Sequence, residues 1–533
     1  MKWKKSLVLL LCVLIGIGTL AGCNSKETNA GKTESTTETD PDKVYPVKST
    51  TTLKYWVRSK AAKSAPNYND SEFAKALIEQ TGINVEFLIP PVGQEQEQFN
   101  IMMASGDYPD IVETPYHAAY FPGGGGKAIK EEVLISLNEP LKKWGPNTTK
   151  MFEKYPEAER ICKSDDGQIY AFPFLRETEE QRIFQGIIVR QDWLDDLNLL
   201  KPETIDEWYE TLKAFRDQKG ATAPLSFHIS LLNSTAFIGA YGVTNGFYLE
   251  DGKMIYGPTQ PGYKEFLKTF RKWYEEGLID KNILAMDAAQ TALDNNILND
   301  KTGATINNAG GGIGKWMAVM EGKDTKFQLA GTKYPVLNKG DRPKFGRMDT
   351  AATPYVSITT NCKDVEAAVR LLDYGYSPKG HLLMNWGIEG ESYTMDENGQ
   401  VSYTDAMKNN DKQLTETEML AQYACGSGPM IQDKQIMRLN FPRPEQQEAI
   451  KLWAETDMLE HFVPGLSPAE EDEEDNVRIS HDLTTYNEQM LAKFLTGSEP
   501  IDNFDQYVAQ LKQLGVDRLQ EIYQKAYDKY INR

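Results

Sequence analysis

Residues 53–104 read LKYWVRSKAAKSAPNYNDSEFAKALIEQTGINVEFLIPPVGQEQEQFNIMMA, and this stretch decides the fold class. Short runs rich in β-branched and aromatic residues, 53–57 and 83–88, alternate with helical patterns near 70–81 and 94–104. Strands that alternate with helices are typical of a sheet connected by crossover helices. The sequence therefore predicts an α/β fold.

Longer helical patterns follow along the chain. Thr204 and Glu207 form a capping box ahead of an apolar stripe that ends at Phe215. Similar stripes over 365–376 and 504–530 predict further helices, and we interpret all three stripes as core faces. The acidic run 470–475 follows prolines and a glycine, so we expect a solvated loop there.

The composition is that of an ordinary globular protein. Of 533 residues, 40% are hydrophobic and 25% are charged, which excludes disorder throughout and leads us to expect two to four domains. Lys and Arg total 58 against 77 Asp and Glu, so the net charge is −19. A nucleic-acid binder would work against this field, and we expect no nucleic-acid partner.

The first 23 residues predict export. Three lysines precede an apolar run from Leu7 to Leu20, which ends in the sequence LAGC at 20–23. Small residues before Cys23 predict a lipoprotein signal at 1–22 and a diacylglycerol on Cys23, whereas a plain cleaved signal would leave this cysteine incidental. Cleavage removes three lysines and no acid, so the net charge changes from −19 to −22. Residues 24–50 contain nine Ser or Thr and few apolar residues, which predicts a disordered tether after Cys23.

Three cysteines remain in the exported chain, Cys162, Cys362 and Cys425. Three thiols cannot all pair with one another, and their spacings of 200 and 63 residues do not match a metal site. We expect buried free thiols and a core that needs no disulfide.

Motifs for catalysis are missing from the sequence. Neither H-E-x-x-H nor G-x-S-x-G occurs, and we find no calcium-binding loop motif. Gly314-Lys315 lacks the glycine of a phosphate loop at Ala309 and its Ser or Thr at Trp316. The 77 acidic residues leave a carboxylate pair for glycoside hydrolysis open, because only geometry selects one. Binding is therefore the leading class, with no cofactor or metal, and we predict that the chain is not an enzyme.

Six stretches resemble one known family in the order in which that family has them. They are ASGDYPDI at 104–111, DGQIYAFPF at 166–174, VRQDWLDDLNL at 189–199, and the segments 202–215, 364–393 and 514–530. Together they are similar to the extracellular solute-binding lipoproteins of carbohydrate ABC importers, solute-binding family 1, in the large form of Gram-positive bacteria. Asn198 replaces the usual glycine at a helix end, where Asn also tolerates the left-handed conformation.

The resemblance implies a periplasmic-binding-protein-like fold of type II, with two discontinuous lobes and a hinge. We expect the first lobe at 51–175 plus about 352–395, and the second at 176–350 plus about 396–533 with C-terminal helices. The implied protein is a lipid-anchored extracellular receptor that captures an oligosaccharide between its lobes and delivers it to ABC permease subunits. We expect a monomer.

A sugar ring needs flat aromatic platforms for its C–H faces and polar side chains for its hydroxyls. In the family such residues lie on loops at the carboxyl ends of strands. The candidates are Arg58, Lys60, Glu113, Tyr116 and His117 in the first lobe, Arg176 and Glu177 at the hinge, Asn307, Asn308, Trp316 and Arg347 in the second lobe, and Trp386, Glu389 and Tyr393 in the 364–393 motif. Ordinary turn, salt-bridge and core roles remain open for all of them.

Several alternatives stay open at this stage. If two or more of the cations Arg58, Lys60, Arg176 and Arg347 face one cleft, the ligand is an acidic oligosaccharide. A secreted glycoside hydrolase or lyase, a peptide-binding lipoprotein and a sensor-kinase accessory protein are the rival functions. The sequence distinguishes none of them by a motif.

Overall fold

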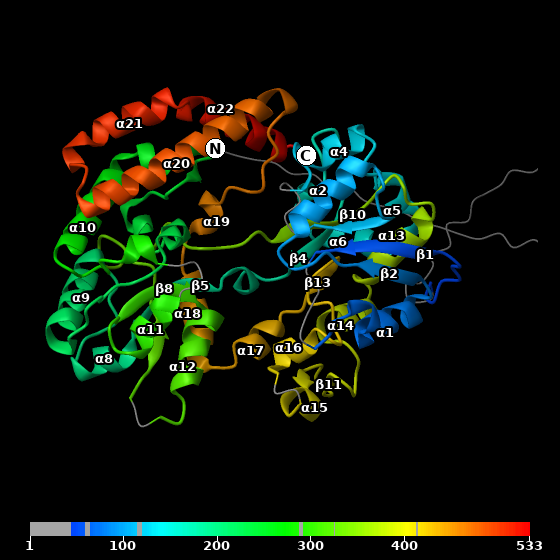
Figure 1. Ribbon diagram of the computed structural model, residues 1–533, viewed down its shortest axis with the longest axis horizontal. Helices are drawn as coiled ribbons and strands as arrows, with labels where there is room; N and C mark the ends of the chain where they lie inside the picture. The colour runs from blue at the N-terminus through cyan, green and yellow to red at the C-terminus, as the bar shows by residue number, and fades with distance from the viewer. Residues whose placement is uncertain (1–43, 59–63, 115–119, 287–290, 324–325, 412–413) are drawn as a thin grey trace, which may run out of the picture. The chain divides into compact units, whose positions relative to one another are not determined.

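The computed structural model describes residues 44–58, 64–114, 120–286, 291–323, 326–411 and 414–533. These residues form two main sheets with separate hydrophobic cores. We name the parts around them the six-stranded region, with the sheet order β13-β4-β10-β3-β1-β2, and the three-stranded region, with the order β8-β5-β9 (Figure 1). The predicted α/β fold class is confirmed.

The six-stranded region begins with the alternation predicted from 53–104. Ser71 caps its first helix by accepting a hydrogen bond from the Ala74 amide at 3.1 Å, and Gly82 ends that helix with a φ of 71°. The five elements are β1 (Thr52–Val57), α1 (Glu72–Thr81), β2 (Asn84–Leu88), α2 (Glu95–Ser105) and β3 (Ile111–Glu113). The first four lie within two residues of their predicted positions.

Three later segments complete this sheet. They are β4 (Phe172–Arg176), β10 (Ala352–Ile358) and β13 (Met430–Gln432). β1 pairs in parallel with β2 and β3, β10 is antiparallel to both β3 and β4, and β13 is parallel to β4. The sheet is covered by helices that include α4 (Gly124–Lys130), α5 (Asn138–Trp144), α6 (Pro146–Lys154), α7 (Pro156–Ile161), α13 (Val365–Tyr374) and α14 (Pro378–Trp386).

The segment after residue 396 differs from the expected lobe division. We expected it in the second lobe, but β13 pairs with β4 of the six-stranded sheet. A small core around Trp386, Tyr403 and Leu420 packs the intervening elements, which are β11 (Tyr393–Met395), β12 (Val401–Tyr403), α15 (Asp405–Lys408) and α16 (Glu416–Leu420). Because β13 has only three residues, its sequence carries too little alternation to be recognised as a strand.

In the three-stranded region, β5 (Gln185–Arg190) lies between β8 (Ala304–Asn308) and β9 (Leu329–Gly331) and is antiparallel to both. Gly186 leaves room for the Trp453 ring, which a Cβ at this position would approach to 2.4 Å. The surrounding helices include α8 (Gln191–Asp196), α9 (Ile205–Lys219), α10 (Pro261–Glu275), α11 (Thr291–Leu298), α12 (Lys315–Met320), α17 (Ile436–Asn440) and α18 (Pro444–Ala454). The capping box of α9 and the left-handed Asn198, with a φ of 53°, are confirmed.

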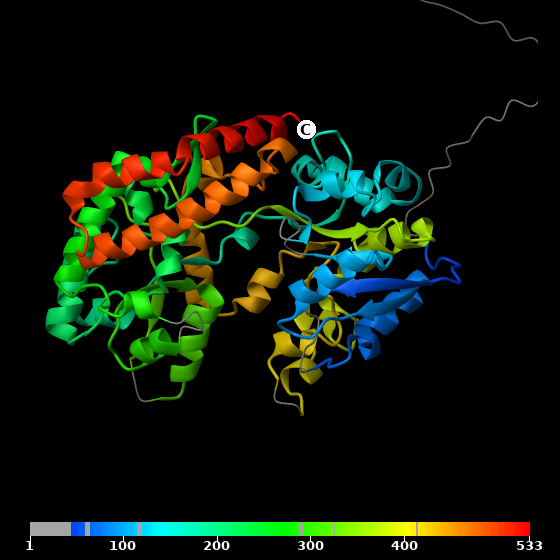
Figure 2. The same ribbon diagram turned by 45° about the horizontal axis from the view of Figure 1, so that its top comes forward.

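A hairpin and the C-terminal helices pack onto the same region. β6 (Phe247–Glu250) and β7 (Lys253–Tyr256) are joined by Asp251-Gly252, both with positive φ as a tight hairpin turn requires. The helices are α19 (Met458–His461), α20 (Glu473–Thr496), α21 (Phe504–Gln513) and α22 (Val516–Tyr530). Figures 1 and 2 show α20 and α22 side by side, and Phe504, Leu511 and Leu519 confirm the predicted core stripe.

The acidic run 470–475 is not a solvated loop, so that prediction is wrong. Residues 470–472 form a 3-10 turn, and Glu473 begins α20, where acidic residues interact favourably with the helix dipole. Asp472 is buried and accepts hydrogen bonds from Arg518 at 2.6 Å and Lys525 at 2.9 Å. The run therefore helps to attach α22 to the start of α20.

The remaining predictions on thiols and membrane segments have simple outcomes. Cys162 and Cys362 are buried and free as predicted, and Cys425 is half-buried, with its thiol donating to the Ser427 carbonyl at 2.5 Å. The signal, Cys23 and tether residues 24–43 lie outside the described residues. The predicted disorder is wrong for the end of the tether, because the Tyr45 hydroxyl donates to the Arg370 carbonyl at 2.6 Å and the Val47 amide donates to the Thr81 carbonyl at 2.7 Å. None of the described helices combines the length and apolar character needed to cross a bilayer.

Candidate functional site

The strand directions show which edges of the two sheets are joined by the connecting segment between β4 and β5. In the six-stranded sheet, β1, β3, β4 and β13 all run in one direction, so their carboxyl ends share an edge. From this edge the chain leaves β4 toward β5. Because β5 is antiparallel to β8, the connection arrives at the carboxyl end of β8. Open α/β sheets bind ligands at the carboxyl ends of their strands.

The segment that follows Leu225 runs alongside β8 toward this same edge of the three-stranded sheet. Leu225 bridges Ala304 of β8 in parallel, and the Ser226 amide donates to the Ala304 carbonyl at 3.1 Å. The chain then continues into the 3-10 helix η4 (Ile229–Ser234). η4 therefore follows a segment that runs toward the edge where ligand binding is expected and where the glycine-rich turn after β8 begins.

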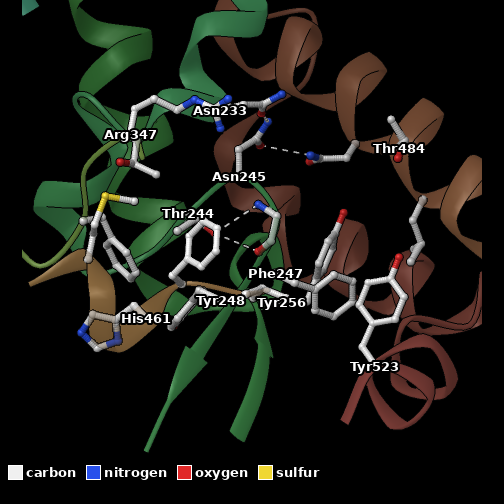
Figure 3. A pocket seen from close by; sticks show the side chains of 18 of the residues that line it. Asn233, Thr244, Asn245, Phe247, Tyr248, Tyr256, Arg347, His461, Thr484 and Tyr523 are labelled. Atoms are coloured by element: carbon white, nitrogen blue, oxygen red, sulfur yellow. Dashed lines mark hydrogen bonds between the residues drawn. The ribbon is translucent and has the colours of Figure 1, made fainter. Parts of the chain in front are cut away.

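A cavity of about 400 Å³ opens beside η4 (Figure 3). It is lined by η4, the β6–β7 hairpin, residues 345–348, α19, α20 and α22. Residues 345–348 continue toward β10 of the six-stranded sheet, so the cavity adjoins a connecting segment. Its volume lies in the range of about 300–1,000 Å³ that is usual for small-molecule sites. This cavity is our candidate site.

Aromatic rings form much of its wall. The Phe247 ring lies 4.8 Å from both Tyr256 and Tyr523, and the Phe345 ring lies 5.1 Å from both Tyr248 and His461. Burial, with a contribution from the charge of Glu250, raises the pKa of Tyr248 to about 12. Burial likewise raises the pKa of Tyr256. Both phenols therefore stay protonated, and the wall offers ring faces together with hydroxyl donors.

Amide side chains supply the polar part of the cavity. The Asn245 side-chain amide donates to the side-chain oxygen Oδ1 of Asn233 at 2.8 Å. The Oδ1 atom of Asn245 accepts from the Tyr263 hydroxyl at 2.8 Å and from the Asn487 side-chain amide at 3.1 Å. Asn487 in turn accepts from the Tyr507 hydroxyl at 2.6 Å. This relay of hydrogen bonds holds the Asn245 side chain in place. Because Asn245 occupies the side-chain oxygen of Asn233, the exposed NH2 group of Asn233 is left to donate to a ligand.

Arg347 adds a cation where the cavity meets the connecting segment. Its side chain is 45% exposed and pairs with Asp349 at 3.1 Å. Asp349 also pairs with Arg176 at 3.4 Å, and its carbonyl oxygen accepts from Arg182 at 2.8 Å. Arg347 and Asn233 both line the cavity, as Figure 3 shows. Among the predicted site residues that the structure describes, Arg347 is the one that lines this cavity.

Other candidates lie at the edge of the six-stranded sheet. Arg58 and Glu113 follow or end β1 and β3, but the Glu113 carboxylate is buried and accepts from the Tyr55 hydroxyl at 3.0 Å. Lys60, Tyr116 and His117 lie outside the described residues.

At the hinge, the two predicted residues form ion pairs and hydrogen bonds within the protein. Arg176 pairs with Asp349, as described above. Glu177 accepts from the Tyr155 hydroxyl at 2.6 Å and pairs with Lys154 at 3.1 Å. The Tyr155 hydrogen bond, supported by Lys154, outweighs burial and lowers the pKa of Glu177.

The predicted aromatic platforms are core residues, which corrects that part of the prediction. Trp316 is fully buried and donates to Asp294 at 2.7 Å, while Trp386 is fully buried and donates to Asp433 at 3.0 Å. Tyr393 is buried beside Trp386, and Glu389 is the exposed one of the three candidates in that motif. A buried ring offers no face to a sugar.

The asparagines at the end of β8 have local partners. Asn307 is buried and accepts from the Asn308 amide at 2.7 Å. Asn308 accepts from Gln185 at 2.8 Å. These contacts match the ordinary turn chemistry that remained open.

Sequence reasoning missed most of the cavity. It named neither Asn233 and Asn245 nor the rings of Tyr248, Phe345 and His461. Asp251-Gly252, a strong hairpin signal, was the available clue to the β6–β7 wall. Nothing in the sequence around η4 marks it as the loop at the sheet edge.

Two further findings bear on chemistry. Among the described residues, no group of three or more His, Cys, Asp or Glu side chains is arranged to hold a metal ion.

The model of the family described as "Bacterial extracellular solute-binding protein" matches residues 65–381, which is more than half of the chain. The chain belongs to this family. Its members bind solutes and are not catalysts.

Known proteins extend this family assignment along the chain. "Lipoprotein LipO" of Bacillus subtilis is 27% identical over 66% of this chain and 69% of its own length. The "Fructooligosaccharide ABC transporter substrate-binding protein FusA" of Streptococcus pneumoniae is 25% identical over 99% of both chains. The crystal structure of the alginate-binding protein AlgQ2 covers 90% of this chain and 98% of its own, with a TM-score of 0.69 at 24% identity. The family fold therefore spans nearly all of the sequence, and this chain is a solute-binding protein of the ABC transporter class.

Proposed function

We propose that this protein captures an oligosaccharide in the cavity beside η4 and delivers it to the permease subunits of an ABC importer. The observation that supports the proposal is the cavity itself, which is lined by η4 and by residues 345–348 of a segment that connects the two sheets. A ligand in this cavity that also contacts the six-stranded region favours the closed state of a hinged receptor. Closure then depends on contacts that the open state lacks.

The lining suits a carbohydrate better than other solutes. Ring faces of Phe247 and Tyr523 border a cavity that also presents the Asn233 amide and the Arg347 guanidinium. Aromatic faces with a few directional polar groups are what a sugar ring requires. The printed name of FusA, a relative over the whole length, says that it binds fructooligosaccharide. Extended peptides use exposed strand edges instead, and the cavity offers mainly rings and side-chain amides.

The choice between neutral and acidic sugars depends on Arg347. Of the four cations considered in the sequence, Arg347 lines this cavity, while Arg176 shares Asp349 with it. One partly neutralised guanidinium supports binding of either ligand class. A neutral and an acidic trisaccharide are therefore the appropriate probes.

Attachment to the membrane through a diacylglycerol on Cys23 is part of the proposal. The leader and its LAGC sequence support it, as does the relative that is named a lipoprotein. The tether at 24–43 then holds the receptor near the permease subunits on the outer face of the membrane. We propose that the receptor acts as a monomer.

Titration calorimetry on the chain from residue 24 tests the function with 1-kestose and with an alginate trisaccharide. We expect one of them to bind and to be recovered chemically unchanged. Asn233→Ala, at an exposed position, should weaken that binding about tenfold. Asn398→Ala, at an exposed turn of the six-stranded region, is the matched control and should leave the affinity unchanged. Absence of binding by the unmodified chain, or cleavage of either sugar, would overturn the proposal.

A further inference from the structure

Thr235 has an unusual backbone conformation at the cavity. It directly follows η4, with a φ of 63° and a ψ of 10°. Five non-glycine residues in the described part of the chain have a positive φ: Glu132, Asn198, Thr235, Asp251 and Asp300. Thr235 alone among them is β-branched, and branching at Cβ makes the left-handed region especially unfavourable. This backbone strain lies at a residue that lines the cavity.

Hydrogen bonds of the surrounding chain hold Thr235 in this conformation. Its amide donates to the Leu232 carbonyl at 3.1 Å, and its carbonyl accepts from the Gly239 amide at 3.0 Å. The turn from η4 into the next 3-10 helix (Ile238–Tyr241) is therefore closed on both sides of Thr235. A glycine would meet the same backbone requirement without strain, so the side chain at 235 needs a separate explanation.

The hydroxyl of Thr235 has no hydrogen-bond partner among the described residues. The residue is 8% exposed, and its Oγ1 atom is buried. A buried hydroxyl without a partner is unfavourable unless a ligand or water supplies one. The other polar groups around it differ, because Thr244 Oγ1 donates to the Gly246 carbonyl at 2.9 Å and Asn245 is fixed by Tyr263 and Asn487. Thr235 is thus a buried lining residue whose hydroxyl oxygen has no partner among the described residues.

We infer that Thr235 is a ligand-contacting, specificity-determining residue of the cavity, whose hydroxyl pairs with a hydroxyl of the bound sugar. The inference rests on the proposed function and adds a residue to its site. Strain and an unpaired polar group are both unfavourable in the free protein, and residues with such strain cluster at functional sites. The bound sugar would provide the missing hydrogen bond.

Thr235→Val tests the contact because it replaces the hydroxyl by a methyl group of similar size. With whichever trisaccharide the unmodified chain binds, we expect an affinity about tenfold lower, while the melting temperature of the ligand-free protein stays equal or rises. Thr235→Ser keeps the hydroxyl and should retain the affinity within about threefold. A Thr235→Val affinity equal to that of the unmodified chain would overturn the inference.

Thr302→Val is the matched control for this change. Thr302 is also buried with an unpartnered hydroxyl, but it does not line the cavity. Its substitution should leave the affinity unchanged and give the same stability response as Thr235→Val. If both substitutions weaken binding equally, a general loss of packing explains the effect and the specific contact is refuted.

A second pair of variants tests the strain. Neither Thr235→Gly nor Thr235→Ala has a hydroxyl, so both should bind about tenfold more weakly than the unmodified chain. Only glycine is free of strain at this φ, so Thr235→Gly should melt at a higher temperature than Thr235→Ala. The reverse order would show that the backbone is not strained. If the unmodified chain binds neither trisaccharide, the proposed function fails, whereas normal binding with unaffected variants refutes this inference alone.

Discussion

The two regions of the molecule each bury a polar cluster, but they complete its hydrogen bonds differently. In the six-stranded region the Asp373 carboxylate is fully buried and accepts from the backbone and side chains of Asn147 and Thr148 at 2.7–3.3 Å. In the three-stranded region the amide relay ends at a cavity, where the Thr235 hydroxyl is unpaired. A completed cluster holds elements together, whereas an incomplete one beside a cavity has capacity for a ligand.

The charge of Asp373 reinforces this difference. Burial raises its pKa, and the hydrogen bonds from Thr148 and Asn147 oppose that shift. The carboxylate also faces the start of α6, where the free amides and the helix dipole favour a negative group. Asp373 therefore joins α13 to α6, and its function needs no ligand.

The largest expected effect is on stability, from Asp373→Ala. Removing the carboxylate leaves the amides of Asn147 and Thr148 buried without a partner, so the free energy of unfolding should fall by about 3 kcal/mol. Urea denaturation of the ligand-free protein measures this change. Affinity for the bound trisaccharide should stay the same, because Asp373 does not line the cavity. A large loss of affinity in a folded variant would contradict a purely structural role.

Asn487→Ala should have an intermediate effect and combine both kinds of loss. Asn487 is buried and bonded to Asn245 and Tyr507, so its removal should lower the free energy of unfolding by about 2 kcal/mol. It should also weaken ligand binding several-fold, because Asn245 loses a partner that positions Asn233.

Denaturation and calorimetry on the same preparation separate the two effects of Asn487→Ala. Unchanged affinity at reduced stability would show that the amide relay serves the fold alone. The comparison between the two clusters would then rest on Thr235 by itself.

The sequence predicted the elements whose signals are local. Alternating runs in 53–104, the Thr204 and Glu207 capping box and the left-handed Asn198 depend on neighbours within a few residues, and the structure has each of them. The short strand β13 was missed because its pairing with β4 joins residues more than 250 positions apart.

Side-chain roles in the candidate site were harder to predict because they depend on distant partners. Trp386 resembles an exposed platform in its motif, but its indole donor pairs with Asp433, which is 47 residues away. Threonine is not a residue that signals a positive φ. At position 235 the hydrogen bonds with Leu232 and Gly239 hold the backbone in that conformation, and a sequence does not show them. A sequence places such residues near an edge of a sheet but does not say which way they face.

The smallest effect concerns pH and a third polar cluster, at Asp433 beside β13. Burial alone would raise the pKa of Asp433, but hydrogen bonds from His381, the Gln435 amide and Trp386 outweigh it and lower the pKa. Because the folded chain holds this carboxylate in its charged form, the stabilisation is complete above the ordinary aspartate pKa of about 4 and is lost as the pH falls through the lower folded value. Asp433→Asn should therefore be less stable than the unmodified chain at about pH 7, with a difference that shrinks toward about pH 3. Denaturation curves of both proteins across this range measure the difference, and a constant difference in stability would mean that the charge of Asp433 does not matter.

The hydrogen bonds of the Asp433 cluster are complete, like those of the Asp373 cluster. The substitution Asp433→Asn should therefore leave the affinity for the trisaccharide unchanged at neutral pH.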